Sequence, residues 1–175
     1  TLDLPTYIRG LELAENYLYL AADENEILVI DISDPSSPFV AGSTSTGLSA
    51  NDVAVSGDYA YMAAGSAGIR VIDISDPGNP SEVAYFHHVG QANEIDIEGK
   101  YLYAAYGTNG MGIVDISNPL MPSETAWWET SDNVRDVDAS GDFVYLADYG
   151  AGLRIIDVSV PSSPSLRDSV AVIYS

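Results

Sequence analysis

Charged and amide side chains recur at two adjacent positions of the chain, once every 42 residues. The first position is occupied by Arg9, Asn51, Asn93 and Arg135, and the second by Gly10, Asp52, Glu94 and Asp136. Three converging carboxylates could hold a hard cation, or two could act as acid and base while the arginines orient an anionic sugar. The alternative is that these groups pair with one another between neighbouring repeats and line a solvated channel. Both interpretations predict that the residues meet around one axis.

Aromatic residues are the candidates for a contact surface. Tyr106 and Tyr149 lie in loops that we expect at the same end of the molecule as the charged positions. Trp127 and Trp128 are adjacent, and neighbouring residues of a strand point to opposite faces of its sheet. We therefore expect one packed indole ring and one outward ring that could stack on a sugar or on a partner.

Signals for a metal site or a catalytic nucleophile are weak. The two histidines, His87 and His88, are adjacent in an expected strand and so cannot both ligate one metal. The acidic segment Asp23-Glu24-Asn25-Glu26 could bind calcium, but it lacks the spacing of a recognised calcium loop and is more typical of a solvated tip. The histidines also lie away from the charged positions, so we expect no Ser-His-Asp triad.

The composition excludes several classes of protein. The 26 acidic and 6 basic residues give a net charge of −20, which repels polyphosphates, so nucleic acid is not an expected partner. There is no cysteine, which excludes disulfides, thiolate metal sites and cysteine nucleophiles. No apolar run approaches the roughly 20 residues that cross a bilayer, so we expect no membrane span in this chain.

The elements that must position these residues are marked by a repeated turn. Asp31-Ile32-Ser33-Asp34-Pro35 is followed by Pro38, and equivalent segments begin at Asp73, Asp115 and Asp157. The aspartates can accept backbone N–H groups and the prolines cannot continue a strand ladder, so these residues are turn formers rather than four acidic sites.

Between the turns, each repeat predicts four short strands. In the second repeat these are an apolar alternation at Val53 and Val55, an aromatic segment 59–63, a β-branched run 69–74 and an outer strand 81–89. The counterparts of the outer strand are expected at 39–46, 123–130 and 165–172. Gly57, Gly99 and Gly141 stand between the first two strands, where a two-residue hairpin turn needs positive φ.

Four short antiparallel strands per 42 residues predict an all-β fold, a β-propeller of four-stranded blades. The expected blades are residues 8–49, 50–91, 92–133 and 134–175, within one domain that covers 1–175. Residues 1–7 occupy the same repeat positions as 169–175, so they are expected as the end of a preceding outer strand. Because the two ends duplicate rather than complement each other, the ring is expected to be incomplete, or completed by further blades or another copy.

The run before each proline turn resembles a known repeat. The matching segments are Ile27-Leu28-Val29-Ile30-Asp31-Ile32-Ser33, Ile69-Arg70-Val71-Ile72-Asp73-Ile74-Ser75 and Leu153-Arg154-Ile155-Ile156-Asp157-Val158-Ser159. They resemble the LVIVD-repeat propellers, and Met111-Gly112-Ile113-Val114-Asp115-Ile116-Ser117 departs from them by its Gly112. The resemblance implies an extracellular or cell-surface protein of a prokaryote, and it implies no common activity.

Three functions are compatible with these patterns. The leading hypothesis is a non-catalytic extracytoplasmic propeller segment that contacts protein or glycan, or that assembles with itself through exposed end strands. The second is a propeller enzyme that acts on an anionic polysaccharide through the axial residues. The third is a calcium-stabilised surface adhesion module; otherwise no cofactor is expected.

Overall fold

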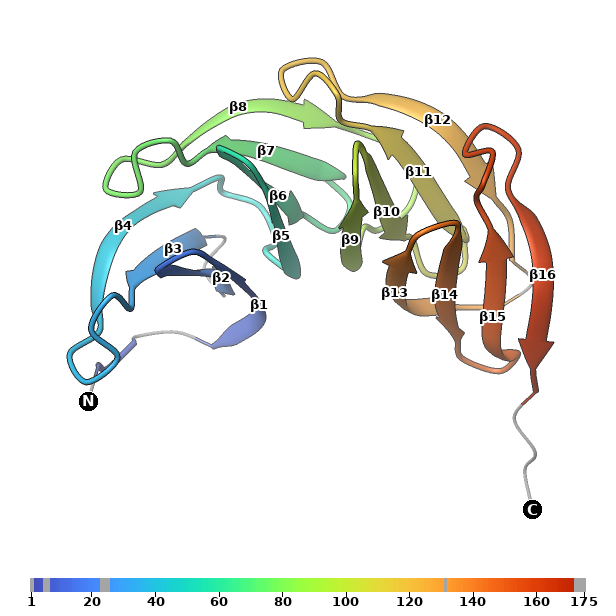
Figure 1. The fold of residues 1–175 in the computed structure, drawn as a ribbon, viewed down its shortest axis with the longest axis horizontal. Coiled ribbons are helices and arrows are strands. Elements are labelled where there is room, and N and C mark those ends of the chain that lie inside the picture. The colour runs from blue at the N-terminus through green and yellow to red at the C-terminus, as the bar shows by residue number, and fades with distance from the viewer. Residues whose placement is uncertain (1, 5–6, 23–25, 131, 172–175) are drawn as a thin grey trace.

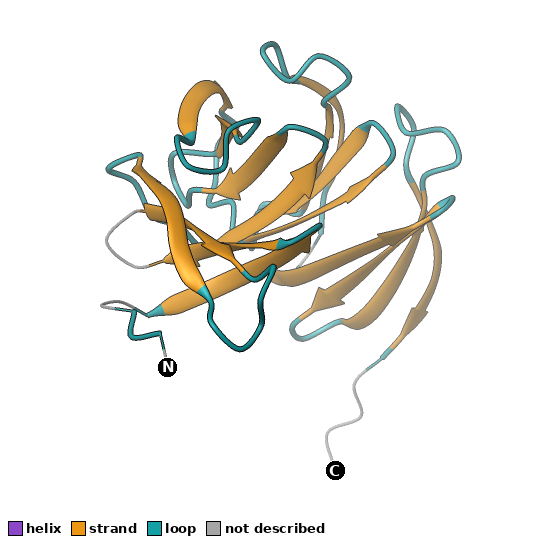
Figure 2. Cartoon of the chain, turned by 60° about the vertical axis from the view of Figure 1, so that its left-hand side comes forward, coloured by secondary structure: helices purple, strands orange, loops and turns teal. Residues whose placement is uncertain are grey.

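The chain folds into four separate sheets that follow an arc. The computed structural model describes residues 2–4, 7–22, 26–130 and 132–171. Every sheet is antiparallel with four strands, and within these residues there is no helix (Figure 2). The four sheets stand side by side around an arc that is open on one side (Figure 1). Among the described residues, no helix could therefore serve as a membrane span.

Each sheet is one blade, and its strands follow one another from the inside of the arc outwards. Blade 1 contains β1 (Ile8–Ala14), β2 (Tyr17–Ala22), β3 (Glu26–Asp31) and β4 (Phe39–Ser45). Blade 2 contains β5 (Asp52–Ser56), β6 (Tyr59–Ala63), β7 (Ile69–Asp73) and β8 (Ser81–Phe86). Blade 3 contains β9 (Glu94–Glu98), β10 (Tyr101–Ala105), β11 (Met111–Asp115) and β12 (Ser123–Trp128). Blade 4 contains β13 (Val134–Ser140), β14 (Phe143–Asp148), β15 (Gly152–Asp157) and β16 (Ser165–Val170). The prediction of four-stranded antiparallel blades is confirmed.

The hairpin between the first two strands of each blade depends on a left-handed residue. Gly57, Gly99 and Gly141 have φ values of 58°, 63° and 59°, as their place in a two-residue turn requires. In blade 1 the equivalent residue is Glu15, with φ 53°. Blade 1 therefore adopts the same turn at a cost in backbone strain that glycine avoids.

The repeated aspartates close turns, as predicted from the sequence. The Oδ1 atom of Asp73 accepts hydrogen bonds from the Ser75 hydroxyl at 2.6 Å and the Ser75 N–H at 2.9 Å. These bonds lower the pKa of Asp73, first through the hydroxyl and then through the N–H. The N–H of Ile74 donates to the carbonyl of Asp58 at 2.9 Å, which ties the proline turn to the hairpin turn. The same bond recurs in the other blades, so both turns lie at one end of the molecule, the lower end.

The hydrophobic core lies in the seams between blades. We call the side of a blade that points to the next blade its following face, and the other side its preceding face. Between blades 2 and 3, Tyr61, Ile69 and Val71 of the following face pack against Leu102 and Val114 of the preceding face. All five are at most 1% exposed. Equivalent clusters fill the seams between blades 1 and 2 and between blades 3 and 4.

Two regions differ from the expected strand limits. The outer strands end at Ser45, Phe86, Trp128 and Val170, one to three residues earlier than expected. The reason is that β7 begins at Ile69, which pairs with Phe86, and Gly68 with φ 80° turns away from the sheet before it. His87 and His88 therefore lie beyond the strand. At the amino end, residues 2–4 form no strand, and Leu2 and Leu4 contact the preceding face of blade 1.

Candidate functional site

The inner strands form an axial groove of about 360 Å³ lined by acidic side chains. The carboxylates in it are Glu12, Asp52, Glu94, Asp96, Asp136 and Asp138. Three of them, Asp52, Glu94 and Asp136, were predicted from the repeat. The remaining three, Glu12, Asp96 and Asp138, stand two residues after Gly10, Glu94 and Asp136, and the period of two of a strand was the signal that could have found them.

Asp52 and Glu94 are in direct contact across the seam between blades 2 and 3. A hydrogen bond joins the two carboxyl groups, and it lowers the pKa of Asp52 while it raises the pKa of Glu94. Burial raises the pKa of Glu94 to about 8, and the charge of Asp52 adds to the shift. Burial also raises the pKa of Asp52, although N–H groups from Ile95 and Val53 oppose the change. The surroundings therefore favour the protonated form of Glu94 as the hydrogen-bond donor to Asp52.

The groove carboxylates also tie one blade to the next. The N–H of Ile95 in blade 3 donates to Oδ2 of Asp52 in blade 2 at 3.0 Å. In the same way the N–H of Ala139 in blade 4 donates to Oδ2 of Asp96 in blade 3 at 2.6 Å. Within the described part of the chain no three His, Asp or Glu side chains are arranged to hold a metal ion. Part of the acidic segment proposed for calcium, residues 23–25, lies outside the described residues.

The arginines and asparagines of the repeat diverge from the groove. The side chain of Asn51 donates from Nδ2 to the carbonyl of Ala92 at 3.0 Å and so bridges blades 2 and 3. Arg135 lies over the ring of Tyr149, with 4.7 Å between the guanidinium carbon and the ring centroid. Arg9 is exposed at a register shift of β1. These contacts give the asparagine a structural role and place Arg135 on an aromatic ring.

A second hollow, of about 470 Å³, opens at the upper end between blades 2, 3 and 4. Its lining is uncharged and rich in amides: Ser66, Gly90, Gln91, Asn93, Tyr106, Gly107, Thr108, Asn109 and Asn133. The loops that supply these residues differ between repeats, whereas the turns of the lower end are repeated. We call this hollow the amide pocket.

Next to the amide pocket lies an aromatic hollow of about 490 Å³, which shares Thr108 and Asn109 with it. The ring of His88 stacks on Trp127 with 3.7 Å between centroids and 13° between planes. His88 Nδ1 lies 2.8 Å from Oε2 of Glu124, and Trp127 Nε1 donates to the carbonyl of Asn109 at 2.6 Å. The aromatic pair is therefore held in place from both sides.

Two expectations for aromatic residues are corrected by the packing. Trp127 and Trp128 are both half-buried, because each packs into a different seam, so neither is an outward ring. Tyr106 is 1% exposed and packs beside Trp127, with 4.9 Å between ring centroids, whereas Tyr149 is 64% exposed. Tyr106 is one of the residues that line the amide pocket, and Tyr149 is the exposed residue of the two.

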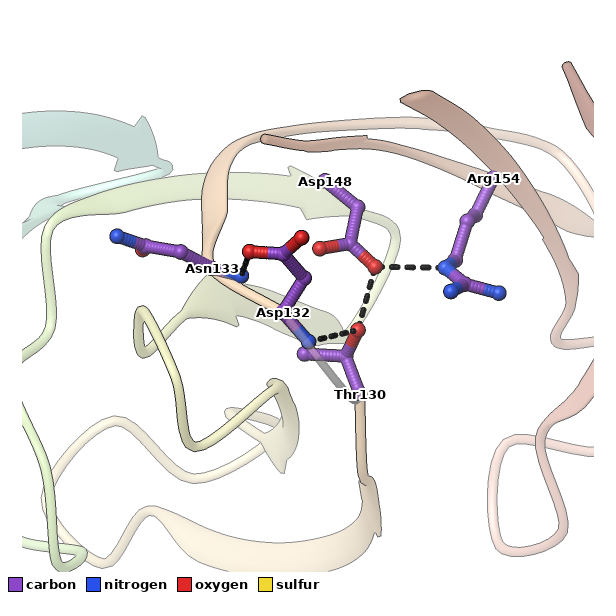
Figure 3. A network of polar contacts seen from close by, with 5 residues as sticks. All are labelled: Thr130, Asp132, Asn133, Asp148 and Arg154. Atoms are coloured by element: carbon purple, nitrogen blue, oxygen red, sulfur yellow. Dashed lines mark hydrogen bonds and ion pairs between the residues drawn. The ribbon is translucent and has the colours of Figure 1, made fainter. Parts of the chain in front are cut away.

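One polar network was not predicted from the sequence. Asp148 of β14 is 1% exposed and pairs with Arg154 of β15, whose Nε lies 2.6 Å from Asp148 Oδ2 (Figure 3). The Thr130 hydroxyl donates to the same oxygen. Asp132 donates its N–H to Thr130 Oγ1 at 3.4 Å and accepts the N–H of Asn133 at 2.8 Å. The network fixes the segment that enters blade 4, and it holds Asn133 at the rim of the amide pocket.

Comparison with known proteins agrees with the architecture. The chain resembles the crystal structure of the computationally designed Ika4 protein at 12% identity and a TM-score of 0.73, over 87% of this chain and 92% of that one. It resembles the crystal structure of the computationally designed Ika8 protein at 11% identity and a TM-score of 0.74, over 94% of this chain. The match covers 49% of Ika8, so the chain spans about half its length. At these identities the likeness concerns the fold alone.

The repeat itself is matched across the chain. No curated protein matches the sequence. The model of the LVIVD repeat matches four times, at residues 7–46, 47–87, 89–130 and 132–172. These matches follow the four blades and include the β-branched run that precedes each proline turn. The chain belongs to the LVIVD-repeat family.

Proposed function

We propose that this β-propeller domain is a non-catalytic, extracytoplasmic module that binds a glycan at its upper end. The observation that carries the proposal is the uncharged, amide-rich lining of the amide pocket in a chain of net charge −20. Amide side chains offer both donors and acceptors, as the hydroxyl groups of a sugar require. An extracytoplasmic location is supported by the acidic composition of the chain and by the resemblance of its repeat to those of prokaryotic surface proteins.

The aromatic hollow extends this argument. Sugar rings present apolar C–H faces as well as hydroxyl groups, and aromatic side chains bind such faces. Trp127 and His88 line the hollow beside Asn109, so one ligand could contact amides and an aromatic edge together. The volumes of about 470 and 490 Å³ lie in the range of small-molecule sites. A neutral oligosaccharide fits this combination better than an anionic one, because the surrounding charge repels anions.

The test is calorimetric titration of the 175-residue chain with a panel of neutral oligosaccharides, next to anionic oligosaccharides of matched length. We expect saturable binding of a neutral member, and a loss of about tenfold in affinity for Asn109→Ala, equal to about 1.4 kcal/mol. The backbone carbonyl of Asn109, which accepts from Trp127, is retained in this variant. Asn79→Ala, in an exposed turn of the lower end, is the matched control. Equal binding by both variants, or binding of proteins but no glycan, would refute the proposal.

A second candidate function rests on the Asp52 and Glu94 pair. Two carboxyl groups in hydrogen-bond contact, one with a pKa raised to about 8, form a paired acid and base, although they lie closer than the roughly 5 Å or more that separates the two carboxyl groups of glycosidases. The other groove carboxylates, together with Arg135 on Tyr149, disfavour the anionic polysaccharide expected from the sequence. Hydrolysis of a polysaccharide that disappears in Asp52→Asn and in Glu94→Gln would establish the enzyme. Activity that survives both changes would remove this candidate.

A further inference from the structure

We propose that two copies of this chain close one ring of eight blades, with the following face of blade 4 in each copy packed on the preceding face of blade 1 in the other. This proposal does not depend on glycan binding at the upper end. It concerns two open faces at the ends of the arc (Figure 1).

The following face of blade 4 carries the residue types of a seam but is open. Leu153 is 40% exposed, whereas the equivalent residues of the first three blades, Ile27, Ile69 and Met111, are at most 1% exposed. Leu153 lines an apolar hollow of about 490 Å³ with Ala147 and Val170. In the other blades the corresponding surface is covered by the next blade.

The preceding face of blade 1 shows the complementary difference. Leu11 is 60% exposed, and its equivalents, Val53, Ile95 and Val137, are 3 to 5% exposed. Ile8 is 37% exposed, whereas its equivalents in the other three blades are at most 3% exposed. Leu13, two residues after Leu11 on the same face, is 57% exposed. Exposed apolar residues that recur at core positions indicate a missing neighbour.

The repeat shows that the two faces fit each other. The seam between blades 3 and 4 joins Tyr103, Ala105, Met111 and Ile113 to Val134, Val137, Val144, Leu146, Ile156 and Val158. A shift by one repeat turns the first set into the following face of blade 4, which carries Tyr145, Ala147, Leu153 and Ile155. The second set becomes the preceding face of blade 1, with Ile8, Leu11, Leu18, Leu20, Ile30 and Ile32. Every member keeps its apolar character, so the chain contains both halves of a further seam.

A hydrogen bond that joins neighbouring blades also has its counterpart at the open face of blade 4. Asp96 accepts the N–H of Ala139 across the seam between blades 3 and 4. One repeat later the corresponding residues are Asp138 and, in a second copy, Leu13. Asp138 is exposed in the single chain. In the closed ring it lies opposite the N–H of Leu13 of the second copy.

The arc of four blades and the pairing of two different faces together indicate that two copies complete the ring. An interface between two different faces of one chain closes into a ring when the rotation permits it, and otherwise gives filaments. The four blades form an arc rather than a closed ring (Figure 1), and the chain covers 49% of the Ika8 chain at a TM-score of 0.74. Two such arcs complete a fold of that size. A second copy supplies both missing neighbours at once.

The amino-terminal segment competes for the same face. Leu2 and Leu4 pack against Leu20, Leu28 and the rest of the outer part of the preceding face of blade 1, whereas Leu11 and Leu13 stay open. In the closed ring β14 and β15 of the second copy occupy the place of residues 2–4. The segment therefore weakens assembly in the free chain.

Sedimentation velocity of the 175-residue chain over a wide range of concentration tests the proposal. We expect a reversible transition between one and two copies, which added salt strengthens because it screens repulsion between chains of charge −20. Leu153→Gln and the double variant Leu11→Gln/Leu13→Gln should each raise the dissociation constant at least about tenfold. Leu120→Gln is the matched control, because Leu120 is 55% exposed in a lower turn. A single copy at all concentrations, as expected if further blades of a longer chain close the ring, would overturn the proposal, and so would filaments.

Mixing the variants tests the arrangement of the faces. Leu153→Gln keeps an intact blade 1, and the double variant keeps an intact blade 4, so the mixture regains one intact seam. We expect more two-copy species in the mixture than in either variant alone. An interface between identical faces would show no such recovery. Leu2→Ser/Leu4→Ser should shift the wild-type equilibrium towards two copies; a shift towards one copy would refute the competition.

Discussion

The seam between blades 2 and 3 and the open face of blade 4 are built from the same residue types at the same repeat positions. Ile69 is 1% exposed in the seam, and Leu153, its equivalent, is 40% exposed. The difference lies in the presence of a neighbour and not in the blade itself. It teaches that the sequence encodes two apolar faces on every blade, whether or not a partner covers them. Stability of a repeat array is then a sum of blades and seams, and the end blades lack one seam each.

The largest difference expected between the inner and end blades concerns an ion pair. Arg154 in blade 4 pairs with Asp148, whose side chain is fully buried, whereas Arg70 in blade 2 pairs with Glu82 at 3.2 Å, with side-chain exposures of 15% and 32%. Arg154→Ala leaves a buried carboxylate without its cation and should lower the free energy of unfolding by about 3–5 kcal/mol. Arg70→Ala should cost no more than about 1 kcal/mol. Urea denaturation of both variants measures the two effects.

The double variant Arg154→Leu/Asp148→Leu checks the reason. It removes both charges and should regain most of the stability lost in Arg154→Ala, because replacing a buried ion pair by apolar groups is often near neutral. Equal losses for Arg154→Ala and Arg70→Ala would contradict the assignment of the blade 4 pair as the buried one.

The second prediction compares Ile69 with Leu153 directly. Ile69→Ala removes buried methyl groups from a filled seam and should cost about 3 kcal/mol. Leu153→Ala truncates an open face and should cost less than about 1 kcal/mol when the chain is present as single copies. Thermal and urea unfolding at low protein concentration provides the measurement. Similar losses at both positions would mean that the face of blade 4 is already covered in the single chain.

The sequence predicted the repeated parts of this molecule and not the unrepeated parts. The blades, the hairpin turns at Gly57 and its equivalents, and the aspartate turns follow from residue patterns that recur in the repeats. The contact between Asp52 and Glu94 was also predictable, because the two residues occupy the same repeat position, at the start of the inner strand of each blade. Tyr106 and the tryptophans were misjudged, because their surroundings depend on Gly112, which leaves space for the indole ring of Trp127. Asp148 was missed because it forms an ion pair with Arg154 of the next strand, and no spacing in the sequence predicts such a pair.

The third prediction concerns pH and the groove between the inner blades. The pKa of Glu94 is raised to about 8 in the folded chain, so between its ordinary value and pH 8 the folded state holds a proton that the unfolded state releases. Stability should therefore fall as pH rises through this window. Glu94→Gln should remove most of the decline and gain about 1 kcal/mol at pH 8, after a discount for solvent screening at this half-buried site.

Glu98→Gln provides the matched control, because Glu98 lies on the same strand and is exposed. Unfolding measured by urea at a series of pH values compares the three proteins. The turns depend on pH in the opposite direction. The pKa of Asp73 is lowered in the folded chain, so the stability that this carboxylate contributes is lost as pH falls through its folded-state pKa. A decline between pH 5 and 8 that persists in Glu94→Gln would show that other groups cause it.

The smallest expected effect separates blade 1 from its neighbours at the hairpin turn. Glu15 has φ 53°, where the next three blades have glycine, and a side chain in this region costs about 1 kcal/mol. Glu15→Gly should therefore raise the free energy of unfolding by somewhat less than this amount, because glycine also loses more chain entropy. Gly57→Ala should lower it by about 1 kcal/mol through the backbone alone, because an added Cβ meets nothing within 4 Å. Glu15→Gln removes the charge but keeps the strain, so it should change little; a gain equal to that of Glu15→Gly would assign the effect to charge instead of φ.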